Sequence, residues 1–339
     1  MRSVVWKHAV AAAALFNVVA VASAMAADDP ELVAKAKREG VVNWYFSNQS
    51  AEVLADGFTK KYGIPVNRLR NGSTSQTLKL INEFRANHVV ADVLDITIGV
   101  PTLVEAGVLI PFELENAKGV DPQYKDPKGY WVATMMFVQM PALNSDIVPA
   151  KDRPKTLDDL LLPMWKDKLV WNPGGSTGAT GFIANILTSR GEEKGMEYLQ
   201  KLKGQNVRSI DISSRAIADQ IIAGEYTLGL GLLQNQAQVS QAQGAPIESL
   251  RLEPLLATTA MVGLTAKSPH PNAGRLFAEF ELSQEGQMLY AKNYFAVRKD
   301  VPPPPGLVEA DRATLNVLSP DDMNNNFEHW TDVYNKLFR

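Results

Sequence analysis

Apolar segments alternate with polar turns and helical segments along the first hundred residues. An apolar run at 41–46 is followed by a helical segment at 51–62 and a second extended segment at 64–69. A strand, a helix and a strand in this order predict two parallel strands joined by a crossing helix. The order repeats, with another strand at 92–96. The pattern therefore predicts an α/β fold.

Two long extended runs, 130–140 and 255–265, interrupt this alternation. Strands that run from one sheet to another can act as hinges between two bodies. The sequence therefore predicts two α/β lobes, each a mixed sheet flanked by helices, joined by crossing hinge strands. We expect residues 27–132 to form the first part of lobe 1 and 133–252 to form lobe 2. Residues 253–339 would return to lobe 1 and add the C-terminal helices.

A glycine-rich turn at 172–178 lies between an apolar strand and a helix, and its chemistry has three interpretations. Free backbone N–H groups at the helix start and the hydroxyls of Ser176 and Thr177 could bind an anion, since Gly174 and Gly175 let the backbone come close to a ligand. Gly178 belongs to the same candidate site. The letters of residues 174–178 also fit the G-x-S-x-G turn of serine hydrolases. A helix start capped by Ser or Thr is the third interpretation.

Other strand ends carry polar residues as well. They are Ser47 and Asn48, Ser73 and Thr74, and Gln234 and Asn235, and the start of a further helix carries Arg215. Ligands of α/β proteins bind outside the carboxyl ends of strands, so these residues are candidate solute contacts. Arg215 could pair with a carboxylate or phosphate. The alternatives are helix capping for the hydroxyls and a solvated arginine at the helix start.

Residues 1–26 have the features of a secretory signal peptide. Arg2 and Lys7 precede a short apolar run, and the segment ends in Ala24-Met25-Ala26. We expect cleavage near Ala26/Ala27 and a periplasmic mature protein. A retained membrane anchor is the alternative, but Asn17 interrupts the apolar run, which is short for a bilayer span.

Composition excludes several function classes. The whole chain of 339 residues has a formal charge of −3, and removal of the two basic residues of segment 1–26 leaves −5. A mildly acidic exported protein is a poor nucleic-acid binder. The sequence has no cysteine, so disulfides, thiolate metal sites and cysteine nucleophiles are absent. No His, Asp or Glu cluster has metal-ligand spacing, and we predict no metal and no cofactor.

Several short motifs, in their order and spacing, resemble a known family. They are Asn71–Ser75, Ala91–Leu94, Leu103–Gly107, Leu157–Leu160, Asn172–Ser176 and Ser214–Ala218. Over nearly all of 27–339 the chain resembles periplasmic solute-binding proteins of ABC importers. The group is the type 2 two-lobed one that includes ferric-ion, 2-aminoethylphosphonate and thiamine binders. The resemblance implies a ligand in the interlobe cleft, lobe closure, permease subunits as partners, and a monomeric protein without enzymatic activity.

Two alternatives accompany the expected capture of a small anionic solute such as a phosphonate, phosphate ester or carboxylate. The ferric-ion branch of the family carries an adjacent tyrosine pair, whereas this chain has Leu232-Leu233-Gln234-Asn235 at that place. A ferric binder without the tyrosine pair is therefore one alternative. The other is an exported hydrolase that uses Ser176, for which His270 and His329 are the only downstream histidines.

Overall fold

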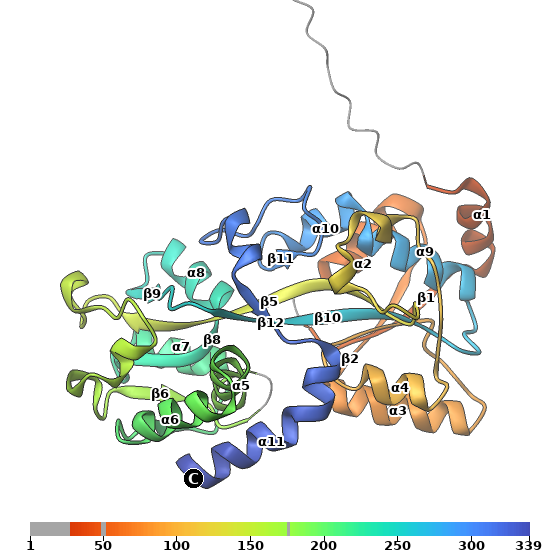
Figure 1. The fold of residues 1–339 in the computed structure, drawn as a ribbon. Helices are drawn as coiled ribbons and strands as arrows, with labels where there is room; N and C mark the ends of the chain where they lie inside the picture. The colour runs from red at the N-terminus through yellow and green to blue at the C-terminus, as the bar shows by residue number, and fades with distance from the viewer. Residues whose placement is uncertain (1–27, 49–51, 175–176) are drawn as a thin grey trace, which may run out of the picture.

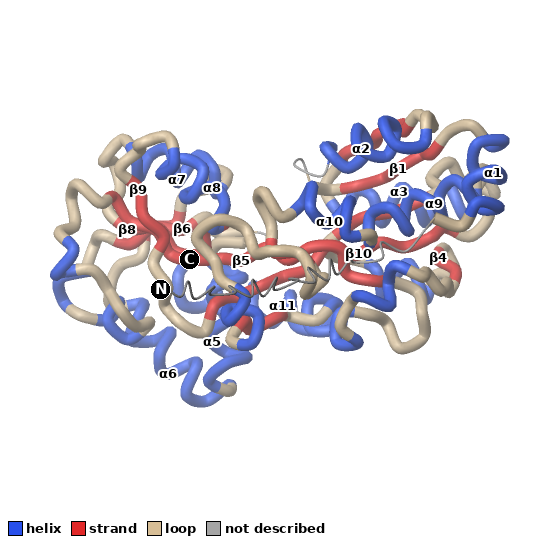
Figure 2. The backbone as a smooth tube through the Cα atoms, turned by 90° about the horizontal axis from the view of Figure 1, so that it is seen from above, coloured by secondary structure: helices blue, strands red, loops and turns tan. Residues whose placement is uncertain are grey.

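The computed structural model describes residues 28–48, 52–174 and 177–339. Two lobes lie side by side, and two long strands, β5 (Val132–Asn144) and β10 (Leu255–Thr265), run between them (Figure 1). The view from above shows the same two bodies with β5 and β10 passing from one to the other (Figure 2). The predicted two-lobed α/β architecture is confirmed. The residue boundaries of the lobes stay a prediction.

The first lobe contains three parallel strands, β1 (Val42–Phe46), β2 (Val66–Arg70) and β3 (Val93–Ile96). Their order in the sheet is β2-β1-β3, and β10 pairs with β3 antiparallel. Because the three strands are parallel, their carboxyl ends meet at one edge of the sheet. The further elements of this lobe are α1 (Pro30–Glu39), α2 (Glu52–Tyr62), α3 (Ser73–Arg85), α4 (Val100–Glu105), β4 (Leu109–Ile110), α9 (Pro271–Leu282), α10 (Gln284–Tyr290) and β11 (Phe295–Ala296).

The second lobe continues the same sheet in the order β5-β8-β6-β7. Its strands β6 (Leu169–Trp171), β7 (Arg208–Ser209) and β8 (Leu228–Leu233) are parallel. The further elements are α5 (Ala179–Arg190), α6 (Glu192–Lys203), α7 (Ser214–Ile222), α8 (Gln234–Ala242) and β9 (Ile247–Ser249). Short 3-10 helices lie in the connections at Asn116–Gly119, Pro122–Tyr124, Ala150–Asp152, Asp158–Leu161, Pro163–Trp165 and Glu309–Ala313.

Each lobe has an aromatic core. In the first lobe, Trp44 stacks on Phe46 with ring centroids 3.9 Å apart, and Phe277 of α9 packs against Trp44 at 5.1 Å. In the second lobe, Trp171 packs edge-on against Phe338, with centroids 4.8 Å apart. Phe338 ends the last helix, α11 (Pro320–Phe338). The C-terminal helix therefore completes the core of the second lobe.

The chain crosses between the lobes a third time on its way to α11. β11 pairs with β5 at Met135 and Met136, and β12 (Leu315–Val317) then pairs with β10 at Leu255 to Ala257. α11 follows and contacts α5 and α6 of the second lobe, and also α4. No helix in the described part of the chain has the length and apolar character to span a bilayer.

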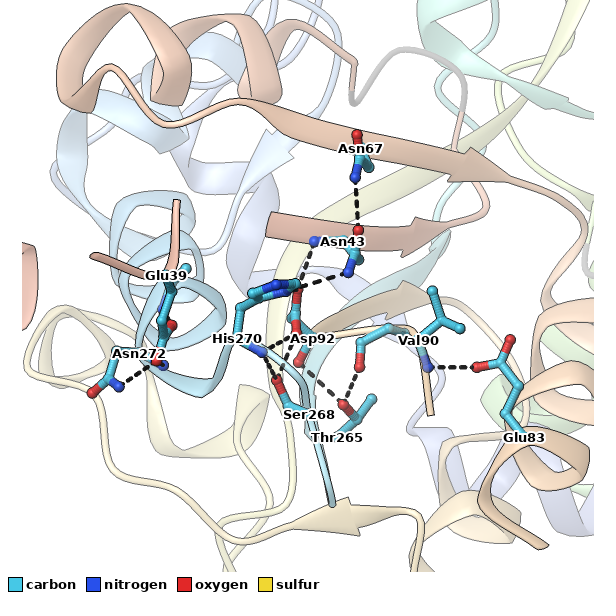
Figure 3. Close-up of polar contacts among 12 residues, drawn as sticks. Glu39, Asn43, Asn67, Glu83, Val90, Asp92, Thr265, Ser268, His270 and Asn272 are labelled. Atoms are coloured by element: carbon cyan, nitrogen blue, oxygen red, sulfur yellow. Dashed lines mark hydrogen bonds and ion pairs between the residues drawn. The ribbon is translucent and has the colours of Figure 1, made fainter. Parts of the chain in front are cut away.

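Asp92 holds the outer end of the first lobe together (Figure 3). Its buried carboxylate accepts hydrogen bonds from the backbone N–H of Asn43 at 2.7 Å and from the Ser268 hydroxyl at 2.6 Å. The backbone N–H of His270 and its Nδ1 contact the same carboxylate at 2.8 and 3.0 Å. A single carboxylate, on the residue just before β3, thus connects β1 with the start of α9. His270 serves this structural network.

Candidate functional site: the interlobe cavity

A cavity of about 280 Å³ lies between the lobes and is bounded by both of them. Its lining residues in the described part of the chain are Ser47, Asn48, Arg70, Ser73, Thr97, Phe137, Thr177, Leu233 and Thr258. A larger open hollow, about 1070 Å³, lies on the first lobe between residues 111–132 and Arg275. That hollow touches none of the predicted strand-end turns. Position at the strand ends, and not volume, therefore identifies the interlobe cavity as the candidate site.

The first-lobe wall of the cavity consists of Ser47, Asn48, Arg70, Ser73 and Thr97. Ser47 and Asn48 follow β1, and Thr97 follows β3, so these three residues lie at the carboxyl ends of the parallel strands. The Ser73 hydroxyl accepts a hydrogen bond from the Thr97 amide at 3.2 Å and lies 3.1 Å from the Thr97 hydroxyl. These contacts fix two hydroxyl groups beside the cavity.

The N-terminus of α3 adds to the polarity of this wall. Its N-cap residue, Gly72, has no side chain to accept from the first-turn N–H groups, and the first turn contains no acidic residue. Those N–H groups and the positive end of the helix dipole therefore stay available to a negatively charged group. Thr74, the second residue of α3, is exposed and does not line the cavity.

Arg70 is the only charged side chain among the described residues that line the cavity. It ends β2, its side chain is 47% exposed, and its Nε lies 3.8 Å from Glu52. This long separation leaves the guanidinium able to pair with a solute. Sequence reasoning missed Arg70 and Thr97, although both stand at strand ends and the rule that selected Ser47 applies to them as well.

Asn48 is held by contacts to two other segments. Its side-chain oxygen accepts a hydrogen bond from the Tyr294 hydroxyl at 3.1 Å, and its amide nitrogen lies 3.1 Å from the Met135 sulfur. Met135 belongs to the crossing strand β5. The turn after β1 is therefore tied to a strand that continues into the second lobe.

The second lobe contributes the glycine-rich turn before α5. Thr177 lines the cavity, and Gly178 adopts φ +78° and donates its N–H to the Gly231 carbonyl at 3.0 Å. A Cβ on Gly231 would lie 2.6 Å from the Gly178 oxygen, so the turn packs directly against β8. Gly178 is the N-cap of α5 and offers no capping side chain. Ser176 lies outside the described residues.

Three other predicted residues lie elsewhere. Gln234 and Asn235 line a small neighbouring cavity, where the Gln234 amide donates to the Pro305 carbonyl at 2.9 Å. Arg215 forms an ion pair with Asp219 and donates to the Ser240 hydroxyl at 3.0 Å. It thus connects α7 to α8 and does not line the interlobe cavity.

The two downstream histidines are engaged away from the glycine-rich turn. His270 binds Asp92, and His329 lies 3.2 Å from Glu192, which follows the far end of α5. A helix of 12 residues is about 18 Å long, and α5 lies along the chain between Thr177 and Glu192, the partner of His329. In the described part of the chain, no three His, Cys, Asp or Glu side chains are grouped closely enough to hold a metal ion.

A family model for bacterial extracellular solute-binding proteins matches residues 100–326, well over half of the chain. The chain belongs to this family. The resemblance drawn from the sequence motifs is confirmed at the level of this family, and with it the coarse function of an extracellular solute-binding protein. The solute itself does not follow from family membership.

Proteins similar to this solute-binding protein include one named for ferric-ion binding and solved structures with iron or fructose-6-phosphate bound. A Fe(3+)-binding periplasmic protein from Serratia marcescens is 30% identical over 190 residues, which are 54% of this chain and 51% of that relative. The match thus spans about half of the relative. Iron-bound HitA from Pseudomonas aeruginosa has a TM-score of 0.73 at 22% identity, over 88% of this chain and 99% of that one.

AfuA from Actinobacillus pleuropneumoniae, with fructose-6-phosphate bound, has a TM-score of 0.65 at 23% identity. This similarity covers 88% of the chain and 96% of AfuA. At these identities the similarity to solved structures establishes the fold alone.

Proposed function

We propose that this protein captures a small anionic solute in the interlobe cavity and delivers it, as a periplasmic monomer, to the permease subunits of an ABC importer. One observation carries the proposal: among the described lining residues there are hydroxyls, an amide and one guanidinium, but no carboxylate. The helix starts of α3 and α5, which have no capping side chains, belong to the two lobes on either side of the interlobe cavity. This donor-rich lining suits a phosphonate, phosphate ester or carboxylate.

Lobe closure is the expected mechanism. Ser73 and Thr177 line one cavity from opposite lobes, so a solute that contacts both hydroxyls holds the lobes together. A ligand shifts a conformational equilibrium only by its difference in affinity for the two states. The solute supplies this difference because the open form leaves one set of its contacts unmade. Binding therefore favours the closed form without any chemical change in the solute.

A bare ferric ion is the alternative that the relatives suggest, and the lining argues against it. Hard trivalent iron requires anionic oxygen ligands, typically phenolate or carboxylate. The described lining residues include no Tyr, Asp, Glu or His. Arg70 would instead repel a cation. The lining therefore supports an anionic solute over a ferric ion bound by the protein alone.

The hydrolase alternative has less support. A serine nucleophile needs a histidine base within hydrogen-bond reach. His270 and His329 are bound to Asp92 and Glu192 on other parts of the molecule. We therefore propose that the protein is not an enzyme. Absence of labelling by a fluorophosphonate reagent is the expected result, and labelling that disappears in Ser176→Ala would overturn this part of the proposal.

A thermal-shift screen of the mature protein tests the proposed function. The panel contains methylphosphonate, phenylphosphonate, glycerol 3-phosphate, citrate and ferric chloride. We expect at least one anion to raise the melting temperature with a dose dependence that follows its occupancy. Stabilisation by ferric ion alone, with no response to any anion, would contradict the proposal.

A further inference from the structure

We infer that the solute combines its anionic group with a flat apolar ring, as in an aromatic phosphonate or an aromatic phosphate ester. This inference rests on the proposed function and concerns the part of the solute that carries no charge. It derives from the lining residues that do not belong to the first-lobe wall. Side chains from the three neighbouring strands β5, β8 and β10 form a surface that we call the cavity floor: Phe137, Leu233 and Thr258.

Strand register places the three floor residues on one face of the sheet. Phe137 of β5 stands directly opposite Thr258 of β10. Leu233 of β8 stands opposite Gln139, two residues beyond Phe137 on the same strand. Residues two apart in a strand point to the same face, as do directly opposite residues of paired strands. The floor is therefore a continuous surface across β10, β5 and β8.

The aromatic ring of the floor is held in place. Phe137 is 8% exposed, and it packs edge-on against Tyr294 with ring centroids 5.1 Å apart. Tyr294 is itself fixed by its hydrogen bond to Asn48. A buried ring with such a neighbour keeps its orientation when a solute arrives. The floor thus presents a preformed surface on which an apolar ring can pack with an offset or edge-on geometry.

The lining consequently combines a polar wall with a largely apolar floor, and Thr177 of the second lobe adds one further hydroxyl. The first-lobe wall holds Arg70 and the hydroxyls of Ser47, Ser73 and Thr97, whereas Phe137 and Leu233 give the floor its apolar character. Thr258 is the only floor residue with a hydrogen-bonding side chain. A sugar or polyol body over this floor would lose most of its hydrogen bonds to water without replacement, which costs affinity. A flat apolar body avoids that loss.

Comparison of two phosphonates that differ only in their organic group tests this inference. Isothermal titration calorimetry on the whole mature protein would use phenylphosphonate, methylphosphonate and fructose 6-phosphate. We expect phenylphosphonate to bind about 10-fold or more tightly than methylphosphonate, because the phenyl group buries apolar surface. We also expect it to bind more tightly than fructose 6-phosphate.

The floor is then tested with Phe137→Leu, which keeps an apolar side chain and removes the ring. The ratio of the phenylphosphonate affinity to the methylphosphonate affinity should fall several-fold, because phenylphosphonate loses its aromatic neighbour whereas methylphosphonate has no ring to pack against it. Phe295→Leu is the matched control, because Phe295 is buried beside β5 but does not line the interlobe cavity. Its ratio should stay unchanged.

The outcomes separate this inference from the proposed function. Three results would contradict an aromatic solute: equal affinities for the two phosphonates, an affinity ratio that Phe137→Leu does not change, or tighter binding of fructose 6-phosphate than of phenylphosphonate. Each of them would still be compatible with a receptor for anions. Failure of every anion in the panel would overturn the proposed function itself, and the inference with it. A melting temperature of each variant, measured without ligand, shows whether its fold is intact.

Discussion

Asp95 and Glu281 share a hydrogen bond between their side chains in the interior of the first lobe. Thr134 donates a second hydrogen bond to Asp95, and Tyr290 donates one to Glu281. Burial raises the pKa of Asp95. Burial and the neighbouring charge of Asp95 raise the pKa of Glu281 well above its ordinary value. Two buried carboxyls in contact cannot both ionise at low cost, so the pair retains a proton.

This pair makes stability depend on pH. A carboxyl whose pKa is higher in the folded state binds its proton more tightly there than in the unfolded chain. Its contribution is fully present below the unfolded pKa, near 4.5 for Glu281, and is lost as the pH rises through the folded value. Each pKa unit of difference corresponds to about 1.4 kcal/mol of unfolding free energy. We therefore expect the melting temperature to fall from pH 6 toward pH 9.

Glu281→Gln should flatten this pH profile, because the amide has no proton to lose, and should stabilise the protein by about 1 kcal/mol or more at pH 9. Differential scanning calorimetry across pH 5–9 measures both effects. Glu285→Gln is the control: its side chain is partly exposed and pairs with Lys61, so its profile should follow that of the unmodified protein. If the melting temperature of Glu281→Gln fell with pH as steeply as that of the unmodified protein, the claim that Asp95 and Glu281 share a proton would be wrong.

Arg70→Ala should weaken anion binding about 10-fold or more, since it removes the only charge among the described lining residues. Arg68→Ala is a closely matched control. Arg68 lies two residues earlier on β2 and also pairs with an acid of α2, Asp56, but it does not line the cavity. Titration calorimetry at low and moderate salt measures both. Equal losses in the two variants would assign the effect to overall charge and not to the cavity.

Gly231→Ala should destabilise the protein by about 2 kcal/mol or more. It combines an unfavourable backbone conformation at φ +64° with a Cβ only 2.6 Å from the Gly178 oxygen. Gly244→Ala shares the positive φ, +86°, but a Cβ there meets nothing within 4 Å, so a cost of about 1 kcal/mol is expected. Urea unfolding compares the two. Similar losses of unfolding free energy in the two variants would show that the turn at Gly178 can move away from β8 without a cost in stability.

Solute binding should compact the molecule, because closure brings the two lobes together around the shared cavity. Small-angle X-ray scattering with a solute that calorimetry has shown to bind measures the radius of gyration in both states. Arg70→Ala at the same solute concentration provides a control with lower occupancy. An unchanged radius at full occupancy would rule out lobe closure as the mechanism.

Several features of the fold and the candidate site follow from sequence pattern alone. Ser47, Asn48, Ser73 and Thr177 line the interlobe cavity because parallel strands bring their carboxyl ends to one edge, and the strands were visible as apolar runs. Arg70 lies at such an edge as well, and the same rule would have selected it. Whether these residues contact a solute stays a prediction.

The cavity floor could not be found in the same way. Every residue of β5 and β10 is buried, so neither strand shows the alternation that tells one face from the other. Only the register with β8 shows that Phe137 faces the cavity. Arg215 illustrates the opposite case. Its helix start is visible in the sequence, and Asp219 stands four residues later on the same helix. The contact of Arg215 with Ser240 of α8, in contrast, is not encoded by any local pattern.

The position of α11 has a consequence for the order in which the second lobe can assemble. Trp171 packs against Tyr334 and Phe338, so the core of the second lobe includes side chains of α11. Without this helix the aromatic surface around Trp171 would stay open. The second lobe therefore reaches its final packing only when two segments far apart in the sequence have met, and this long-range contact adds the entropy cost of closing a long loop.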